Sequence, residues 1–148
     1  MTVATFSNGI LDTSNYQGIT VRTSAALTAS IVYTDWMDVR LFEAIDWIVF
    51  LTARGSITRL DMQAQWTTKI TPNDTTDWTT LQIEEIASIG VSTLSDYVLR
   101  RTITDVITLG ISLPVRGRFM RLGIFAGVGS AVGSLCSIDS LRRKPRNT

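Results

Sequence analysis

The chain contains no histidine and a single cysteine, Cys136. Without histidine, neither Ser-His-Asp nor Cys-His catalysis can be assembled, and the imidazole sites that bind zinc, iron or copper are excluded. One cysteine can form neither an intramolecular disulfide nor a cluster of thiolates around a metal. We therefore expect no cofactor or metal, and we expect Cys136, which alternates with Ile138, to be a buried and unreactive side chain.

Net charge and long apolar runs are also lacking. Fourteen Lys and Arg residues face 13 Asp and Glu residues, a net charge of +1, which is typical of neither a strongly basic nucleic-acid binder nor an acidic tail. Residues 122–138 carry no charge, but glycine and serine dilute their hydrophobicity, and they are shorter than the roughly 20 apolar residues of a spanning helix. We expect two strands joined by a glycine-rich turn there, and no membrane contact. The polar first ten residues lack the features of a secretory signal, so we expect synthesis in a cytoplasm.

What the sequence does contain is a repeated alternation of apolar and polar residues. Between Arg59 and Trp66 the apolar positions are Leu60, Met62, Ala64 and Trp66, and residues 45–51 and 120–124 follow the same rule. A period of two predicts half-buried strands. We expect strands at residues 19–23, 29–33, 36–39, 44–53, 58–67, 79–86, 96–104, 108–113, 119–125 and 134–141, with a short helix as an alternative within residues 81–94.

Many short strands without intervening helices predict an all-β fold, an antiparallel two-sheet β-sandwich of jelly-roll or Greek-key type with extended termini. A chain of 148 residues suits one domain. We expect residues 1–16 to form an extended N-terminal arm, residues 17–141 the sandwich domain, and residues 142–148 a basic C-terminal tail.

Motifs that would indicate catalysis or ion binding are incomplete. Glu84 and Glu85 are adjacent, so in a strand they would point to opposite faces and could not share a substrate. The glycines at 127, 129 and 133 miss the dinucleotide fingerprint by one residue. Asp74 and Asp77 lack the regular series of oxygen ligands in a dedicated calcium loop. We expect a protein that is not an enzyme.

Two groups of residues are candidates for binding. The first is basic and consists of Arg116 and Arg118 at a corner, together with Arg142, Arg143, Lys144 and Arg146 near the end of the chain. These residues predict contact with an acidic partner surface rather than with nucleic acid, because no ladder of aromatic residues accompanies them. The second is an alternative glycan site at Trp78, with Asn73, Asp74 and Asp77 beside it. Trp78 is the one tryptophan whose position is compatible with exposure, although a core role is favoured for it as well.

Three segments together resemble the small β-sandwich proteins of tailed-bacteriophage virions. They are residues 33–39 before the apolar strand at 45–51, the Gln65-Trp66-Thr67 and Asp77-Trp78-Thr79 pair, and residues 113–122, where a corner leads into a late strand. In that family such sandwiches serve as capsid decoration (cement) proteins, or as baseplate, tail and head-fibre modules, often as trimers. The resemblance implies no catalysis and supplies no individual functional residue.

The resemblance implies a non-enzymatic structural protein of the virion, made in the host cytoplasm. Its expected partners are the major capsid protein or other virion proteins, and further copies of itself in a homotrimer. A capsid decoration protein that binds adjacent major-capsid subunits is the leading hypothesis. A tail, baseplate or fibre module and a carbohydrate-binding module are the alternatives.

Overall fold

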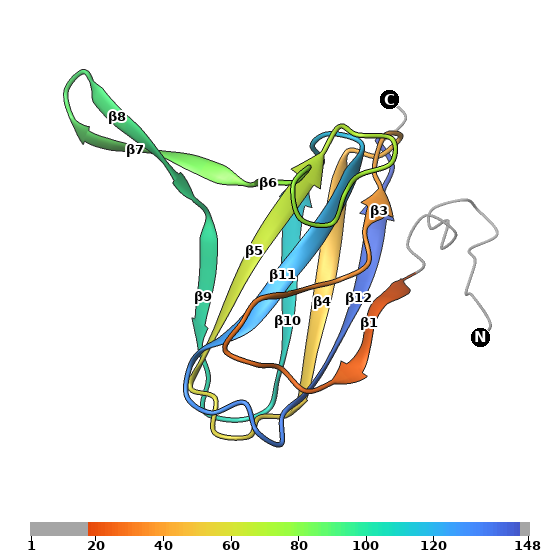
Figure 1. The fold of residues 1–148 in the computed structure, drawn as a ribbon, viewed down its shortest axis with the longest axis vertical. Helices are drawn as coiled ribbons and strands as arrows, with labels where there is room; N and C mark the ends of the chain where they lie inside the picture. Colours follow the sequence, from red (N-terminus) through yellow and green to blue (C-terminus); the bar gives the residue numbers. More distant parts are fainter. Residues whose placement is uncertain (1–17, 146–148) are drawn as a thin grey trace, which may run out of the picture.

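In the computed structural model, which describes residues 18–145, the chain forms twelve strands and no helix (Figure 1). The strands are β1 (Ile19–Ala25), β2 (Val32–Tyr33), β3 (Met37–Asp38), β4 (Ala44–Ala53), β5 (Arg59–Thr67), β6 (Thr79–Thr80), β7 (Gln82–Ser88), β8 (Val91–Asp96), β9 (Val98–Thr102), β10 (Ile107–Pro114), β11 (Phe119–Val128) and β12 (Leu135–Arg143).

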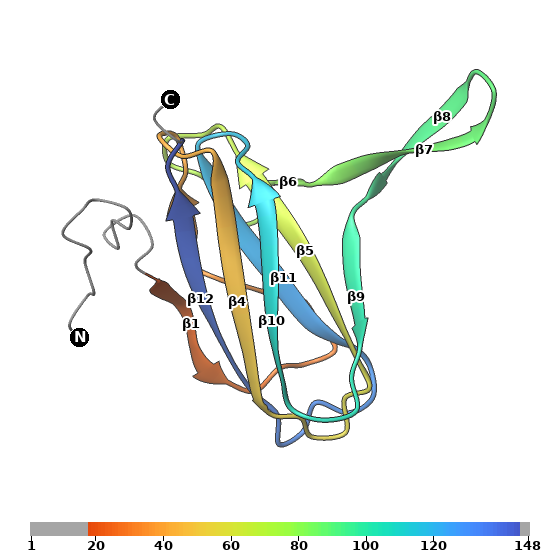
Figure 2. The ribbon, with the colours of Figure 1, turned by 180° about the vertical axis from the view of Figure 1, so that it is seen from behind.

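Two antiparallel sheets pack face to face, which confirms the predicted all-β sandwich. Sheet A has the strand order β1-β12-β4-β10, and Figure 2 shows these four strands side by side. Sheet B has the order β2-β11-β5-β6, with β3 also paired to β11 and β9 also paired to β5. Every strand pair among the described residues is antiparallel.

The core lies between the sheets and follows the alternation in the sequence. Sheet A contributes Val21, Ile45, Trp47, Val49, Leu51, Cys136 and Ile138, and sheet B contributes Leu60, Met62, Ala64, Met120, Leu122 and Ile124. All are buried. Filling a sandwich in this way needs only every second residue of each strand, because successive side chains point to opposite faces.

The outer edge of sheet B is formed by β6 and β9, which follow each other along β5 and are separated in the sequence by a hairpin. Thr80 of β6 lies opposite Gln65, the amide of Leu81 donates to the carbonyl of Ala64 at 2.8 Å, and Val98 of β9 lies opposite Gln63. Between Leu81 and Val98 the chain leaves the sheet, and β7 and β8 pair only with each other. Figure 1 shows this hairpin projecting away from the sandwich.

Two local predictions need correction. The alternative helix within residues 81–94 is wrong, because this segment forms the β7–β8 hairpin. The predicted strand at 134–141 continues to Arg143, since Arg142 and Arg143 pair with Ile45 and Ala44 of β4 and thus belong to sheet A rather than to a tail. The predicted two strands joined by a glycine-rich turn are confirmed as β11 and β12, and the turn leads from sheet B to sheet A. Residues 1–16 of the predicted arm and Arg146 lie outside the described residues.

Candidate interaction surfaces

Backbone hydrogen bonds bring three separate segments together at one end of the sandwich. The amide of Val39 donates to the carbonyl of Arg118 at 2.9 Å, that of Glu43 to Arg143 at 2.9 Å, and that of Val115 to Glu43 at 3.1 Å. The corner at Gly117 needs a left-handed backbone (φ 63°), and a Cβ there would overlap the carbonyl of Thr67. We call the surface formed by residues 38–46, 115–118 and 142–144 the basic end.

The basic end unites five of the six basic residues that the sequence suggested. Its cations are Arg40, Arg116, Arg118, Arg142, Arg143 and Lys144, and its carboxylates are Asp38, Glu43 and Asp46. Six positive and three negative groups give a formal charge of +3. Arg116 and Lys144 are exposed, so this charge is accessible to a partner.

The other arginines of the basic end are held in defined positions. Arg142 donates to the carbonyl of Asp38 at 2.9 Å and lies over the ring of Phe42. Arg143 forms an ion pair with Asp46 at 3.1 Å, and Arg40 forms one with Asp38 at 2.7 Å. The hydrogen bond from Arg40, with a weaker effect from Arg118, holds the pKa of Asp38 below its usual range.

The β7–β8 hairpin is the second surface that stands out. Residues 82–96 contain Glu84, Glu85 and Asp96 and no Lys or Arg, a formal charge of −3. Ile89 at the tip is fully exposed, Leu94 is 69% exposed, and Ile83 is 40% exposed. A two-stranded hairpin without a covering layer is marginally stable in water, so burial of these apolar side chains against a partner would stabilise the hairpin.

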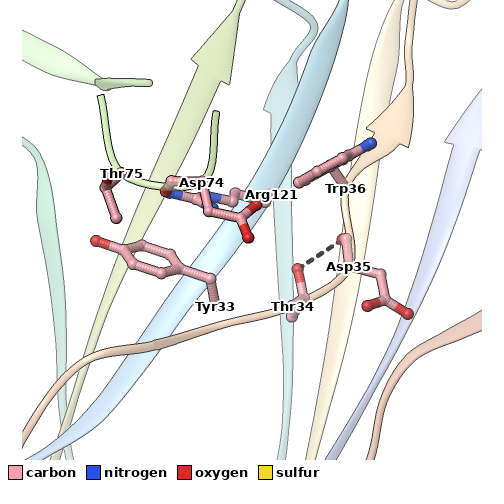
Figure 3. Close-up of a pocket in the computed structure, with 7 residues that line it drawn as sticks. All are labelled: Tyr33, Thr34, Asp35, Trp36, Asp74, Thr75 and Arg121. Atoms are coloured by element: carbon pink, nitrogen blue, oxygen red, sulfur yellow. Dashed lines mark hydrogen bonds between the residues drawn. The ribbon is translucent and has the colours of Figure 1, made fainter. Parts of the chain in front are cut away.

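The third surface is a pocket on the outer face of sheet B. Figure 3 shows it between the segment that joins β2 to β3 and the loop at residues 68–78. Its volume is about 710 Å³, and it is lined by Tyr33, Thr34, Asp35, Trp36, Asp74, Thr75 and Arg121. We call it the aromatic pocket.

Arg121 forms the floor of the aromatic pocket and is only 5% exposed. Its guanidinium lies 3.9 Å from the ring centre of Tyr33 and 4.2 Å from that of Trp78. Its Nε donates to Oε1 of Gln65 and its Nη2 to the carbonyl of Asp74, both at 2.9 Å. Arg121 therefore fastens the loop at 68–78 to the sheet.

Burial lowers the pKa of Arg121, and Tyr33 and Asp74 partly offset this effect. Arginine remains charged even so, because its ordinary pKa lies far above neutrality. Among the described residues no carboxylate lies within ion-pair distance of Arg121. The aromatic faces of Tyr33 and Trp78 thus take the place of a counter-ion.

Of the four residues predicted to form a glycan site, only some lie at the aromatic pocket. Trp78 is half-buried against Arg121 and Trp36, whereas Trp36 is the exposed tryptophan, at 39%. Trp78 therefore has a packing role, in line with the core role favoured for it. Asn73 and Asp77 close the loop, since Asp77 accepts from the amide of Asn73 at 2.7 Å. Of the four, Asp74 alone lines the pocket.

Most of this pocket could not be predicted from the sequence. Arg121 is far from Tyr33 and Trp36 in the chain, and it meets them only because β2 and β3 pair with β11. Arg121 follows Arg116 and Arg118 closely in the sequence, but unlike them it is buried, on the outer face of β11.

Within residues 18–145, no group of three or more Asp, Glu or Cys side chains is arranged to hold a metal ion. No helix in this part of the chain is long and apolar enough to span a membrane. Cys136 is buried, as predicted. No protein-family model and no curated protein sequence matches this chain.

Proposed function

We propose that this chain is a non-enzymatic structural protein of a virion, most specifically a decoration protein that oligomerises and binds adjacent capsid subunits. The observation that carries the proposal is the β7–β8 hairpin, a projecting arm that pairs with no other described strand and exposes Ile83, Ile89 and Leu94. Such an arm suits attachment to another subunit, because burial of its apolar side chains is available only there.

The strand order supports the same proposal. If β2 with β3, and β6 with β9, are each counted as one interrupted strand, the eight strands form two sheets with the orders 1-8-3-6 and 2-7-4-5. From this order we infer a jelly roll, an architecture that recurs in viral capsid and lectin domains. Fold alone does not define function, so this argument adds to that from the hairpin.

We further propose that the hairpin of one copy binds the basic end of a second copy. The hairpin has a formal charge of −3 and the basic end one of +3, so the two surfaces attract each other and the charges orient the contact. At about 3.3 Å per residue, the seven residues of β7 extend about 20 Å, which gives the hairpin the reach of an arm. A contact between unlike surfaces generates a ring or a filament, and a closed trimer is the expected form.

Light scattering after size exclusion tests the oligomer. The matched variant joins Leu81 to Tyr97 with a short Asn-Gly turn, which removes residues 82–96. The amide of Tyr97 already donates to the carbonyl of Leu81 at 2.7 Å, so β6 and β9 can stay in place. We expect a trimer for the wild type and a folded monomer for the variant. An unchanged trimer in the variant would refute the role of the hairpin.

A charge-exchange experiment tests which surface receives the hairpin. Glu84→Lys with Glu85→Lys should weaken the oligomer, as should Arg116→Glu with Lys144→Glu. Mixing the two variants should restore assembly, because the reversed hairpin of one then meets the reversed basic end of the other. Failure of the mixture, with both variants folded, would place the contact elsewhere.

Localisation on intact particles separates the head from the tail. Antibodies against the purified protein should label the heads of virions, and labelling of tails or fibres would favour the alternative module. Removing residues 144–148 tests the basic tail in capsid attachment. This deletion begins after Arg143 because Arg142 and Arg143 belong to β12, and we expect weaker attachment with an unchanged melting temperature.

A further inference from the structure

We propose that the aromatic pocket is a binding site for a neutral saccharide. The proposal rests on the pocket alone and is independent of the hairpin and of the oligomer. A volume of about 710 Å³ lies within the range of about 300–1,000 Å³ that is usual for small-molecule sites.

The walls of the pocket have the character that a sugar ring requires. Trp36 is 39% exposed and Tyr33 is 37% exposed, and both line the pocket. Such side chains present an apolar surface to the C–H face of a sugar and keep a polar atom at the rim. Figure 3 shows Tyr33 and Trp36 on opposite sides of Arg121, with Asp74 between them.

The aromatic walls are fixed before any ligand arrives. The guanidinium of Arg121 lies over the rings of Tyr33 and Trp78, and the ring centres of Trp78 and Trp36 are 5.5 Å apart. Gln65 donates to the hydroxyl of Tyr33 at 3.3 Å. Side chains that are already ordered lose little entropy on binding, so weak stacking contacts can contribute to affinity.

The charges around the pocket disfavour ligands of either sign. The carboxylates of Asp35 and Asp74 are exposed at its rim and would repel an anion, while the Nε and Nη2 groups of Arg121 are already used. A ligand cation would meet the guanidinium of Arg121, which already occupies the faces of Tyr33 and Trp78. A neutral ligand avoids both repulsions.

The polar groups at the rim match the hydroxyls of a sugar. A carboxylate accepts hydrogen bonds and donates none, so Asp35 and Asp74 need donors such as sugar hydroxyls. Hydrogen bonds to charged groups are the stronger kind. Figure 3 shows the Asp74 carboxylate directed toward the space between Tyr33 and Trp36.

The test uses the full chain and the methyl glycosides of glucose, galactose, mannose and N-acetylglucosamine as probes, with methyl glucuronide as the anionic and choline as the cationic comparator. Binding is detected by saturation-transfer NMR and quantified by titration at millimolar ligand. We expect at least one neutral glycoside to bind more tightly than both comparators. No binding of any neutral probe, or tighter binding of glucuronide or choline, would overturn the proposal.

Two variants locate the binding. Trp36→Ala should raise the dissociation constant by about tenfold or more, the loss of about 1.4 kcal/mol. Asp74→Asn should also weaken binding. This variant keeps the backbone carbonyl that accepts from Arg121, so the position of the loop should not change. Val132→Ala is the matched control, because Val132 is an exposed apolar residue outside the pocket. Unchanged affinity in folded Trp36→Ala protein would overturn the site, and thermal melts of each variant establish that it is folded.

Discussion

Replacing Arg121 with methionine tests whether two aromatic rings can stabilise a buried cation without a carboxylate. Methionine has a similar length and keeps the apolar stem, but it removes the guanidinium. The opposite outcome is a real physical alternative, because apolar replacement of a buried charge is often neutral or stabilising, by up to about 4 kcal/mol. The sign of the change therefore decides the question.

The contacts of Arg121 set the expected magnitude. Its hydrogen bonds to Gln65 and Asp74 involve a charged donor and contribute about 1.5–3 kcal/mol each. The two desolvated cation–π contacts contribute up to about 2 kcal/mol each. Against these stands the desolvation of the guanidinium, which costs several kcal/mol. The contacts together contribute roughly 3–10 kcal/mol, so we expect them to exceed the desolvation cost by a few kcal/mol.

The variant also leaves a buried acceptor without a donor. Gln65 is buried, so its Oε1 loses a hydrogen bond that water does not readily replace, at about 1–3 kcal/mol. The carbonyl of Asp74 belongs to an exposed residue, so a water molecule can replace its lost hydrogen bond. We therefore expect Arg121→Met to destabilise the fold by about 3 kcal/mol, which lowers the melting temperature by about 10 °C.

Urea denaturation and calorimetry of the wild type, Arg121→Met and Arg121→Lys provide the measurement. Lysine keeps the charge but lacks the planar fork, so Arg121→Lys should also be destabilised. A melting temperature of Arg121→Met equal to or above that of the wild type would show that desolvation outweighs the contacts, and the reasoning above would be refuted.

Two further predictions concern Gly127 and Cys136. A Cβ at Gly127 would overlap the buried carboxylate of Asp61, so Gly127→Ala should lower the free energy of unfolding, measured by urea denaturation, by about 2 kcal/mol. In the control Gly110→Ala no atom lies within 4 Å of the new Cβ, so the free energy of unfolding should change by less than about 0.5 kcal/mol. Equal effects of the two substitutions would refute the steric argument. Burial raises the pKa of the Cys136 thiol to about 11, from 9.0 for a free thiol, so the folded state binds this proton more tightly than the unfolded state does. The contribution of Cys136 to stability should thus be constant below pH 9 and decline between pH 9 and about 11. The difference in free energy of unfolding between wild type and Cys136→Ala should change by this decline across the range, because the other titrating groups are common to both proteins.

The sequence was sufficient to predict the sandwich because its inner faces obey a simple rule. Ile45, Trp47, Val49 and Leu51 alternate with outward residues, and all four are buried as predicted. The rule fails for the outer face of β5, where Asp61 and Gln65 are buried too. The Asp61 carboxylate lies against Gly127 of β11, and Gln65 is covered through its bond to Arg121. A period of two cannot reveal such cover, because it comes from segments distant in the sequence.

The candidate sites were predictable to different degrees. The basic end was partly visible, because its residues form two clusters in the sequence and the fold places these clusters together. The aromatic pocket was not, since nothing local indicates that Tyr33 and Trp78 enclose Arg121. The hairpin was hidden for another reason: residues 79–86 and 96–104 do form strands in part, but the chain leaves sheet B at Leu81, and no glycine or proline marks this departure.

The place where the hairpin leaves the sheet also limits how copies of the chain can associate. An open sheet edge is a template for pairing with another sheet, and the outer edge of sheet B could serve as one. This edge consists of the short strands β6 and β9, and the hairpin projects from between them. A second sheet that approached along this edge would meet the hairpin before a continuous ladder of backbone hydrogen bonds could form between the two sheets. The hairpin therefore stands in the way of extension of sheet B at this edge, and the proposed association of two copies through the hairpin does not use this edge.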